Sequence, residues 1–108
     1  MKLMTKDLEK KMPKPSSTEK DEDPICQVKY FNPAGRGNWF GIEYDPKTRT
    51  FFGYASIFGD HNDELGYFSL DELESFKGPF GMGIERDLYF KPQPLSEIKA
   101  RYTRGYNE

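Results

Sequence analysis

The chain has 108 residues, with 16 Lys and Arg against 18 Asp and Glu, and its formal net charge is −2 at pH 7. This length predicts one domain, and the acidic balance argues against a protein that coats nucleic acid through a global basic surface. Cys26 is the only cysteine, which excludes an intramolecular disulfide and favours the reducing cytoplasm. No apolar run reaches the roughly 20 residues of a membrane span, and residues 1–12 lack the apolar region of a signal peptide. We therefore expect no membrane partner.

The N-terminal segment predicts a short helix followed by a linker. Thr5 is placed to cap a helix over residues 6–11, which carries acidic residues early and basic residues late. Pro13 ends this helix, and the polar, proline-bounded run that follows is typical of a mobile connector. We divide the chain into an N-terminal helix (1–13), a flexible linker (14–24) and a single α+β domain (25–108).

The middle of the chain predicts a sheet rich in aromatic residues, because rings make up 16% of a chain that is only 35% hydrophobic. Apolar and polar residues alternate with the period of a strand over 25–30, 39–44, 49–58, 65–68 and 84–90. In the first of these strands, Cys26, Val28 and Tyr30 share one face, while Gln27 and Lys29 form a solvated face.

The second and third strands predict a hairpin with rings on both faces, joined by a tight turn at Asp45-Pro46. The side chains expected to pack across it form two sets, Phe40, Ile42 and Tyr44 on one strand and Phe52, Tyr54 and Phe58 on the other.

Two further helices are expected after the hairpin. Ser69 to Glu72 matches a capping box for a helix that ends near Phe76, and a last helix begins near Leu95 or Ser96. The fold class is therefore α+β, with a small antiparallel sheet of about five strands. A short N-terminal helix, a helix after the fourth strand and a C-terminal helix complete it.

Three stretches of the second half carry a family resemblance. They are Glu64-Leu65-Gly66-Tyr67-Phe68-Ser69-Leu70-Asp71-Glu72-Leu73-Glu74, Gly78-Pro79-Phe80-Gly81 and Ile84-Glu85-Arg86-Asp87-Leu88-Tyr89-Phe90. Together with the leading Leu3-Met4-Thr5-Lys6, they resemble the domain of unknown function 2958 family, small proteins of plasmids, conjugative elements and phages. The resemblance implies a mobile-element origin and names no catalytic residue.

Four residues are candidates for acid–base chemistry. His61 and Asp63 share a turn, and Glu85 and Asp87 lie on one face of a strand. An exposed turn and surface ion pairs explain the same residues, and no second His or Cys completes a metal set. We therefore assign no catalytic residue and expect neither a metal nor a cofactor. The glycine-rich run 78–83 follows a helix and enters a strand, an order that indicates a plain connector and not a phosphate loop.

The candidate binding residues combine basic side chains with rings: Arg36, Trp39, Arg86, Lys99, Arg101 and Tyr102. Bases stack on rings while cations follow phosphates, which suits single-stranded nucleic acid; core packing and a solvated helix end explain the same residues. Our leading hypothesis is a non-enzymatic binding or regulatory protein of a bacterial mobile genetic element, an antidefence or transfer-accessory factor with a protein partner. The alternatives are a single-strand nucleic-acid-binding protein and a small hydrolase or nucleotide-processing enzyme.

Overall fold

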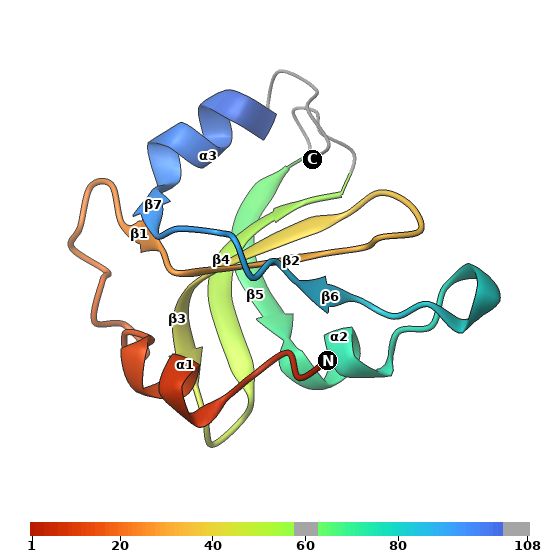
Figure 1. The fold of residues 1–108 in the computed structure, drawn as a ribbon. Coiled ribbons are helices and arrows are strands. Elements are labelled where there is room, and N and C mark those ends of the chain that lie inside the picture. Colours follow the sequence, from red (N-terminus) through yellow and green to blue (C-terminus); the bar gives the residue numbers. More distant parts are fainter. Residues whose placement is uncertain (58–62, 103–108) are drawn as a thin grey trace.

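The computed structural model describes residues 1–57 and 63–102 and has an α+β fold (Figure 1). Its helices are α1 (Lys6–Lys11), α2 (Leu70–Ser75), the short 3₁₀ helix η1 (Pro79–Gly81) and α3 (Leu95–Tyr102). Its strands are β1 (Ile25–Cys26), β2 (Val28–Phe31), β3 (Asn38–Asp45), β4 (Thr50–Ser56), β5 (Glu64–Ser69), β6 (Glu85–Arg86) and β7 (Gln93–Pro94). Among the described residues, no helix has the length and apolar character needed to cross a membrane.

The strands form a five-stranded sheet and a small second sheet, in which every pairing is antiparallel. The larger sheet has the order β5-β4-β3-β2-β6, and β1 pairs with β7 beside it. This confirms the predicted small antiparallel sheet with helices near both ends and in the second half of the chain.

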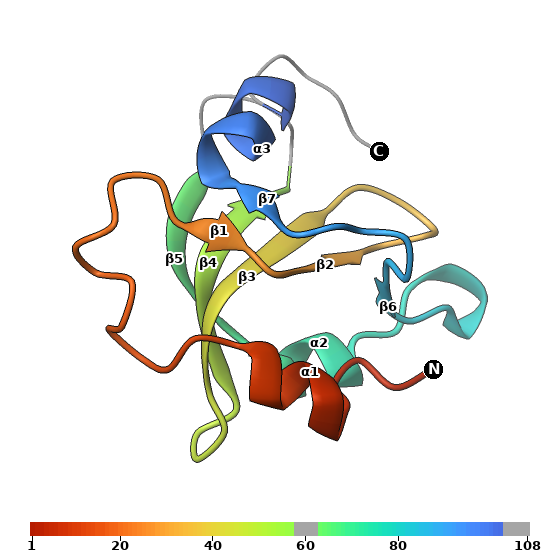
Figure 2. The same cartoon turned by 60° about the vertical axis from the view of Figure 1, so that its left-hand side comes forward.

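Helices cover the sheet from both sides, with α1 and α2 on one side and α3 on the other (Figure 2). On the α1 side, the core contains Leu3, Met12, Tyr30, Phe51 and Leu70 among others. On the α3 side, it contains Cys26, Phe40, Ile42, Tyr54, Leu95, Ile98 and Tyr102. The rings of Phe51 and Phe68 stack at 4.9 Å between centroids in the first core. The prediction that both faces of the hairpin carry rings is therefore confirmed.

The ends of the helices follow the predicted local chemistry. The Thr5 hydroxyl accepts a hydrogen bond from the Leu8 amide at 3.1 Å, and the Ser69 hydroxyl accepts one from the Glu72 amide at 3.2 Å. Both helix starts were predicted from these capping residues, and both predictions are confirmed.

Two predictions about strand faces are wrong. The predicted strand 25–30 is divided at Gln27, so Cys26 lies in the α3-side core while Val28 and Tyr30 lie in the α1-side core. In β3, the pairing shifts between Gly41 and Glu43, and this bulge places the Tyr44 ring on the α1 side, away from Phe40. Phe58, the last ring predicted for this hairpin, lies outside the described residues.

The predicted strand 84–90 is also shorter than expected, because only Glu85 and Arg86 pair with β2. The Asp87 side chain accepts a hydrogen bond from the Tyr89 amide at 2.9 Å, and the Phe90 amide donates to the Asp87 carbonyl at 3.3 Å. These local bonds turn the chain away from the ladder.

Segment 14–24 runs beside β3 and is bonded to it through one carboxylate. The Glu43 side chain accepts hydrogen bonds from the Ser16 amide at 2.7 Å, the Thr18 amide at 3.0 Å and the Thr18 hydroxyl. The flexibility expected of this segment stays a prediction, as does the division of the chain at residues 13 and 24.

Candidate functional site

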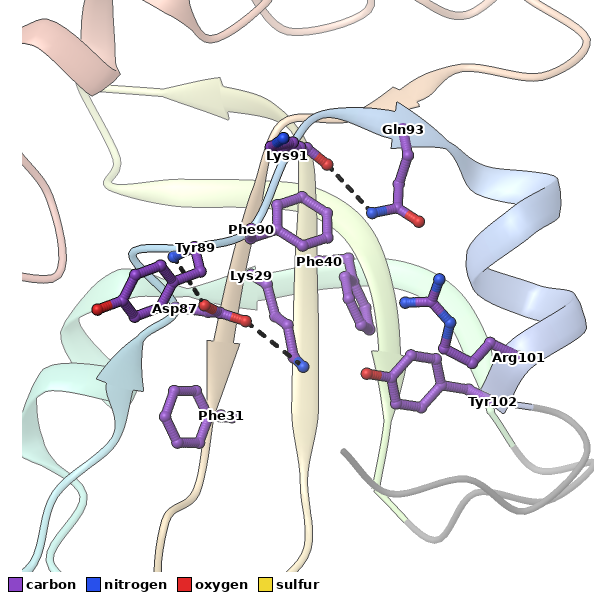
Figure 3. Close-up of a pocket in the computed structure, with 10 residues that line it drawn as sticks. All are labelled: Lys29, Phe31, Phe40, Asp87, Tyr89, Phe90, Lys91, Gln93, Arg101 and Tyr102. Carbon is purple, nitrogen blue, oxygen red and sulfur yellow. Dashed lines mark hydrogen bonds and ion pairs between the residues drawn. The ribbon is translucent and has the colours of Figure 1, made fainter.

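A pocket of about 510 Å³ opens on the α3 side of the sheet (Figure 3). Its walls come from β2 and β3, from the segment after β6 and the start of β7, and from the end of α3. The lining residues are Lys29, Phe31, Phe40, Asp87, Tyr89, Phe90, Lys91, Gln93, Arg101 and Tyr102. Its volume falls within the range of about 300–1,000 Å³ that is usual for small-ligand sites.

A buried lysine lies at the floor of this pocket. Lys29 pairs with Phe40 across β2 and β3, so its side chain lies on the α3 side of the sheet, and the residue is 8% exposed. Its amine is 3.8 Å from the Asp87 carboxylate, 6.0 Å from the centre of the Phe31 ring and 5.7 Å from that of Tyr102. The charge is therefore held between two ring faces and one carboxylate.

Asp87 is fixed in this position by the backbone around it. Its amide donates to the Lys29 carbonyl at 2.9 Å, just beyond the last paired residue of β6. The bond from the Tyr89 amide then orients its carboxylate (Figure 3). The lysine and its partner are thus positioned by the same turn that ends β6.

The inner wall of the pocket is aromatic and packed against the α3-side core. The helix α3 buries Leu95, Ile98 and Tyr102, a spacing that places all three on one face of a helix. The Tyr102 ring lies 5.1 Å from that of Phe40, edge to face, and Phe40 in turn lies 5.8 Å from Phe90.

The rim of the pocket is exposed and basic. Tyr89, Lys91 and Arg101 are exposed, while the Phe31 and Phe90 rings are half-buried. Across residues 1–57 and 63–102, the lining side chains include three cations, Lys29, Lys91 and Arg101, against one carboxylate. An anion that also carries a flat apolar part therefore finds both kinds of surface here.

The structure brings together some of the predicted residues. Arg101 and Tyr102, predicted for binding, line the pocket with Asp87, which was a catalytic candidate. Lys99 instead lines a separate depression beside Phe52 and Leu65.

The other predicted binding residues lie elsewhere. Arg36 is exposed in the turn between β2 and β3. Trp39 pairs with Tyr30 on the opposite side of the sheet, and its indole lies so close over Gly37 that a Cβ there would approach it to 2.8 Å. Arg86 also pairs with Tyr30, and its Nε is buried without a hydrogen-bond partner.

The predicted acid–base residues lie at two edges of the sheet. Asp63, next to β5, accepts a hydrogen bond from the Ser56 hydroxyl at 2.7 Å. Glu85 and Asp87 belong to β6 and the turn after it, with β4, β3 and β2 between them and β5. His61 lies outside the described residues. Within residues 1–57 and 63–102, no group of three or more His, Cys, Asp or Glu could hold a metal ion.

Several pocket residues were not predicted as binding residues. Lys29 was expected on a solvated face, but α3 and the turn at Asp87 cover it. Tyr89, Phe90, Lys91 and Gln93 come from a segment that was predicted in part as a strand. The run Tyr89-Phe90-Lys91 does combine rings with a cation, and this pattern could have identified these three residues as binding candidates.

A second exposed feature is the loop between α2 and β6, which protrudes from the molecule (Figure 1). The Gly78 amide donates to the Met82 carbonyl at 2.7 Å, and the Gly81 and Met82 amides donate back within the loop at 3.1 and 3.2 Å. Phe80 at its tip is 100% exposed and has a φ of 61°. The side chains of Phe76 and Met82 are exposed at its base.

Comparison with known proteins identifies one family. The model of the family described as "Protein of unknown function (DUF2958)" matches residues 3–104, nearly the whole chain. No curated protein matches the chain, and no solved structure does.

Proposed function

The chain belongs to the family of proteins of unknown function DUF2958, and we propose that it is a non-enzymatic binding protein of a bacterial mobile genetic element with another protein as its partner. The mobile-element origin rests on the family resemblance. An antidefence or transfer-accessory role would follow from that origin, with the protein occupying a surface of a host or element-encoded macromolecule.

The observation that supports a protein partner is the full exposure of Phe80 in a strained backbone conformation. A bulky residue in the left-handed region costs about 1–2 kcal/mol, and a fully exposed ring gains nothing from burial in the isolated chain. The three backbone hydrogen bonds of the loop hold this unfavourable arrangement in place. Strained residues cluster at active sites, ligand clamps and switch regions, so a strained and fully exposed ring supports a binding role for this loop.

The shape of the loop indicates what the partner offers. Phe80 forms a convex apolar tip, and Met82 and Phe76 widen the apolar surface below it. Such a tip fits an apolar cleft, where one buried aromatic residue contributes a large share of the binding energy. Because the loop is already closed by its own hydrogen bonds, little conformational entropy is lost when it docks.

The experiment uses the immobilised full chain to capture proteins from a bacterial host lysate. The compared chains are wild type, Phe80→Ser and Tyr67→Ser. Tyr67 is the matched control, since its ring is 79% exposed but lies on β5, outside the loop. We expect one protein to be captured in about equimolar amount by wild type and by Tyr67→Ser, and not by Phe80→Ser.

The captured protein is then purified and titrated directly. Loss of the Phe80 ring should weaken binding by about 2 kcal/mol or more, which is about thirtyfold in Kd. Thermal melting checks that all three chains are folded, and Tyr67→Ser should melt slightly lower because it loses an edge-to-face contact with the Phe52 ring. Capture of no protein, or capture that Phe80→Ser leaves unchanged, would contradict the proposal.

A further inference from the structure

We propose that the pocket between β2, segment 87–93 and α3 binds a nucleotide unit, a phosphate joined through a sugar to a base. This site is distinct from the Phe80 loop and is independent of the function proposed above. The unit is either a free mononucleotide or one residue of a single strand, and the two sources share the same recognition chemistry.

The cations of the pocket would bind the phosphate. Arg101 and Lys91 are exposed at the rim, and the buried amine of Lys29 lies below them. Among the described residues that line the pocket, three positive charges against the one carboxylate of Asp87 leave an excess of two. This excess matches a phosphate group, and Arg is well suited to paired hydrogen bonds with its oxygens.

The rings of the pocket would stack on the base. Phe31 and Phe90 are half-buried, so each keeps one part of its ring within the packed wall and leaves another part open. Phe90 is held against Phe40, and Phe31 lies beside the Lys29 amine (Figure 3). Rings held in this way stack on any base without large loss of side-chain freedom.

The net charge of −2 for the whole chain is compatible with this local site. A single nucleotide needs a local group of cations and not a basic surface that follows a long backbone. The volume of about 510 Å³ also suits one unit of this kind and not a folded macromolecule.

The test is calorimetric titration of the full chain with nucleoside monophosphates and with a short single-stranded oligonucleotide, each at low and moderate salt. Adenosine, ribose 5-phosphate and phenyl phosphate are the partial probes: adenosine lacks the phosphate, ribose 5-phosphate lacks the base, and phenyl phosphate keeps a phosphate on a flat ring but lacks both the sugar and the base. We expect saturable binding of a nucleotide or of the oligonucleotide that weakens as salt rises, and much weaker binding of all three partial probes.

Two pocket variants and two matched controls locate the binding. Arg101→Gln should weaken it about tenfold or more, and Phe31→Leu, which keeps an apolar side chain, about fivefold or more. Lys47→Gln and Tyr67→Ala remove an exposed cation and an exposed ring that do not line the pocket, and they should leave affinity unchanged. Melting curves check that every variant folds, and Arg101→Gln, at an exposed side chain, keeps the test decisive if Phe31→Leu unfolds.

Binding of the mononucleotide identifies the free ligand as the source, while binding of the oligonucleotide alone identifies a single strand. Either result supports the site if Arg101→Gln weakens it. The proposal is overturned if nothing binds, if Arg101→Gln and Lys47→Gln behave alike, or if phenyl phosphate binds as tightly as the nucleotide.

Discussion

Gly53 and Gly66 lie opposite each other on β4 and β5, but the space beside them differs. A Cβ at Gly53 would lie 1.9 Å from the Phe40 carbonyl oxygen, next to the bulge of β3. A Cβ at Gly66 would meet no atom within 4 Å. The same residue type therefore has a steric role at one position and none at the other.

This difference gives a prediction at the scale of a residue. Gly53→Ala should lower the free energy of unfolding by about 3 kcal/mol or more, because backbone must move to admit the methyl group. Gly66→Ala is the matched control. It should leave the free energy of unfolding unchanged or raise it by about 0.4–1 kcal/mol, because alanine lowers the conformational entropy of the unfolded chain. Urea unfolding of both variants checks this, and equal losses at the two positions would contradict it.

Lys29 shows at the same scale how a residue can be assigned to the wrong environment. Its position in an alternating strand predicts solvent exposure, and that prediction is wrong because two distant segments cover it. The alternation itself is correct, since Lys29 and Tyr30 do lie on opposite sides of the sheet. Periodicity separates two faces but does not say which of them is covered.

At the scale of elements, segment 14–24 depends on the Glu43 side chain of β3. Burial of Glu43 acts to raise its pKa, but hydrogen bonds from Thr18 and Ser16 outweigh this and lower the pKa below its usual value. A lowered pKa means that the folded state prefers the ionised carboxylate. Its contribution to stability is present above the unfolded pKa of about 4.3 and is lost as the pH falls through the folded pKa.

We therefore expect Glu43→Gln to lower the free energy of unfolding by about 1–3 kcal/mol at neutral pH and to expose segment 14–24 to proteases. The difference from wild type should shrink as the pH falls below the unfolded pKa of about 4.3, because the unfolded wild-type chain then takes up a proton that folded Glu43 resists. Glu22→Gln, an exposed carboxylate in the same segment, is the control. The measurements are limited proteolysis and urea unfolding, the latter at neutral pH and in acid below the unfolded pKa of Glu. A difference in unfolding free energy between Glu43→Gln and wild type that does not change with pH would argue against this account.

At the scale of the whole molecule, both cores enclose groups that stay protonated in the folded state. Burial, with a smaller effect of the Asp23 charge, raises the pKa of the Cys26 thiol to about 12. Burial also raises the pKa of Tyr54 to about 12, assisted by Asp63, and raises that of Tyr30 in the opposite core. Each of these groups ionises more readily in the unfolded chain.

The consequence is a loss of stability in alkali that involves both cores. The contribution of these groups is complete below the unfolded pKa values of about 8.5 for Cys and 10 for Tyr, and it decreases as the pH rises above them. We expect the urea midpoint to fall between about pH 8 and pH 11. Cys26, with a relative exposure of 0%, should react with thiol reagents at the rate of unfolding. A constant midpoint over this range, or rapid reaction of the native thiol, would contradict the prediction.

Much of the fold could be predicted from the sequence because its signals are local. The Thr5 and Ser69 hydroxyls each accept a hydrogen bond from an amide three residues away, so the starts of α1 and α2 can be identified from residues close together in the sequence. The two long strands β3 and β4 were predicted from alternation and from the turn at Asp45, whose side chain accepts a hydrogen bond from the Lys47 amide at 2.9 Å. The short strands β6 and β7 were less predictable, because each depends on a partner far away in the chain.

The sequence by itself determined the α+β class, the caps and the hairpin, since each of these rests on residues a few positions apart. Only the tertiary structure decided that α3 covers the face with Lys29 and Phe40, and that the turn at Asp87 closes over the same lysine. It also decided that Trp39 and Arg101 belong to different surfaces. The physical reason is that burial depends on contacts between segments distant in the chain, so identical local patterns can lead to a solvated face or to the floor of a pocket.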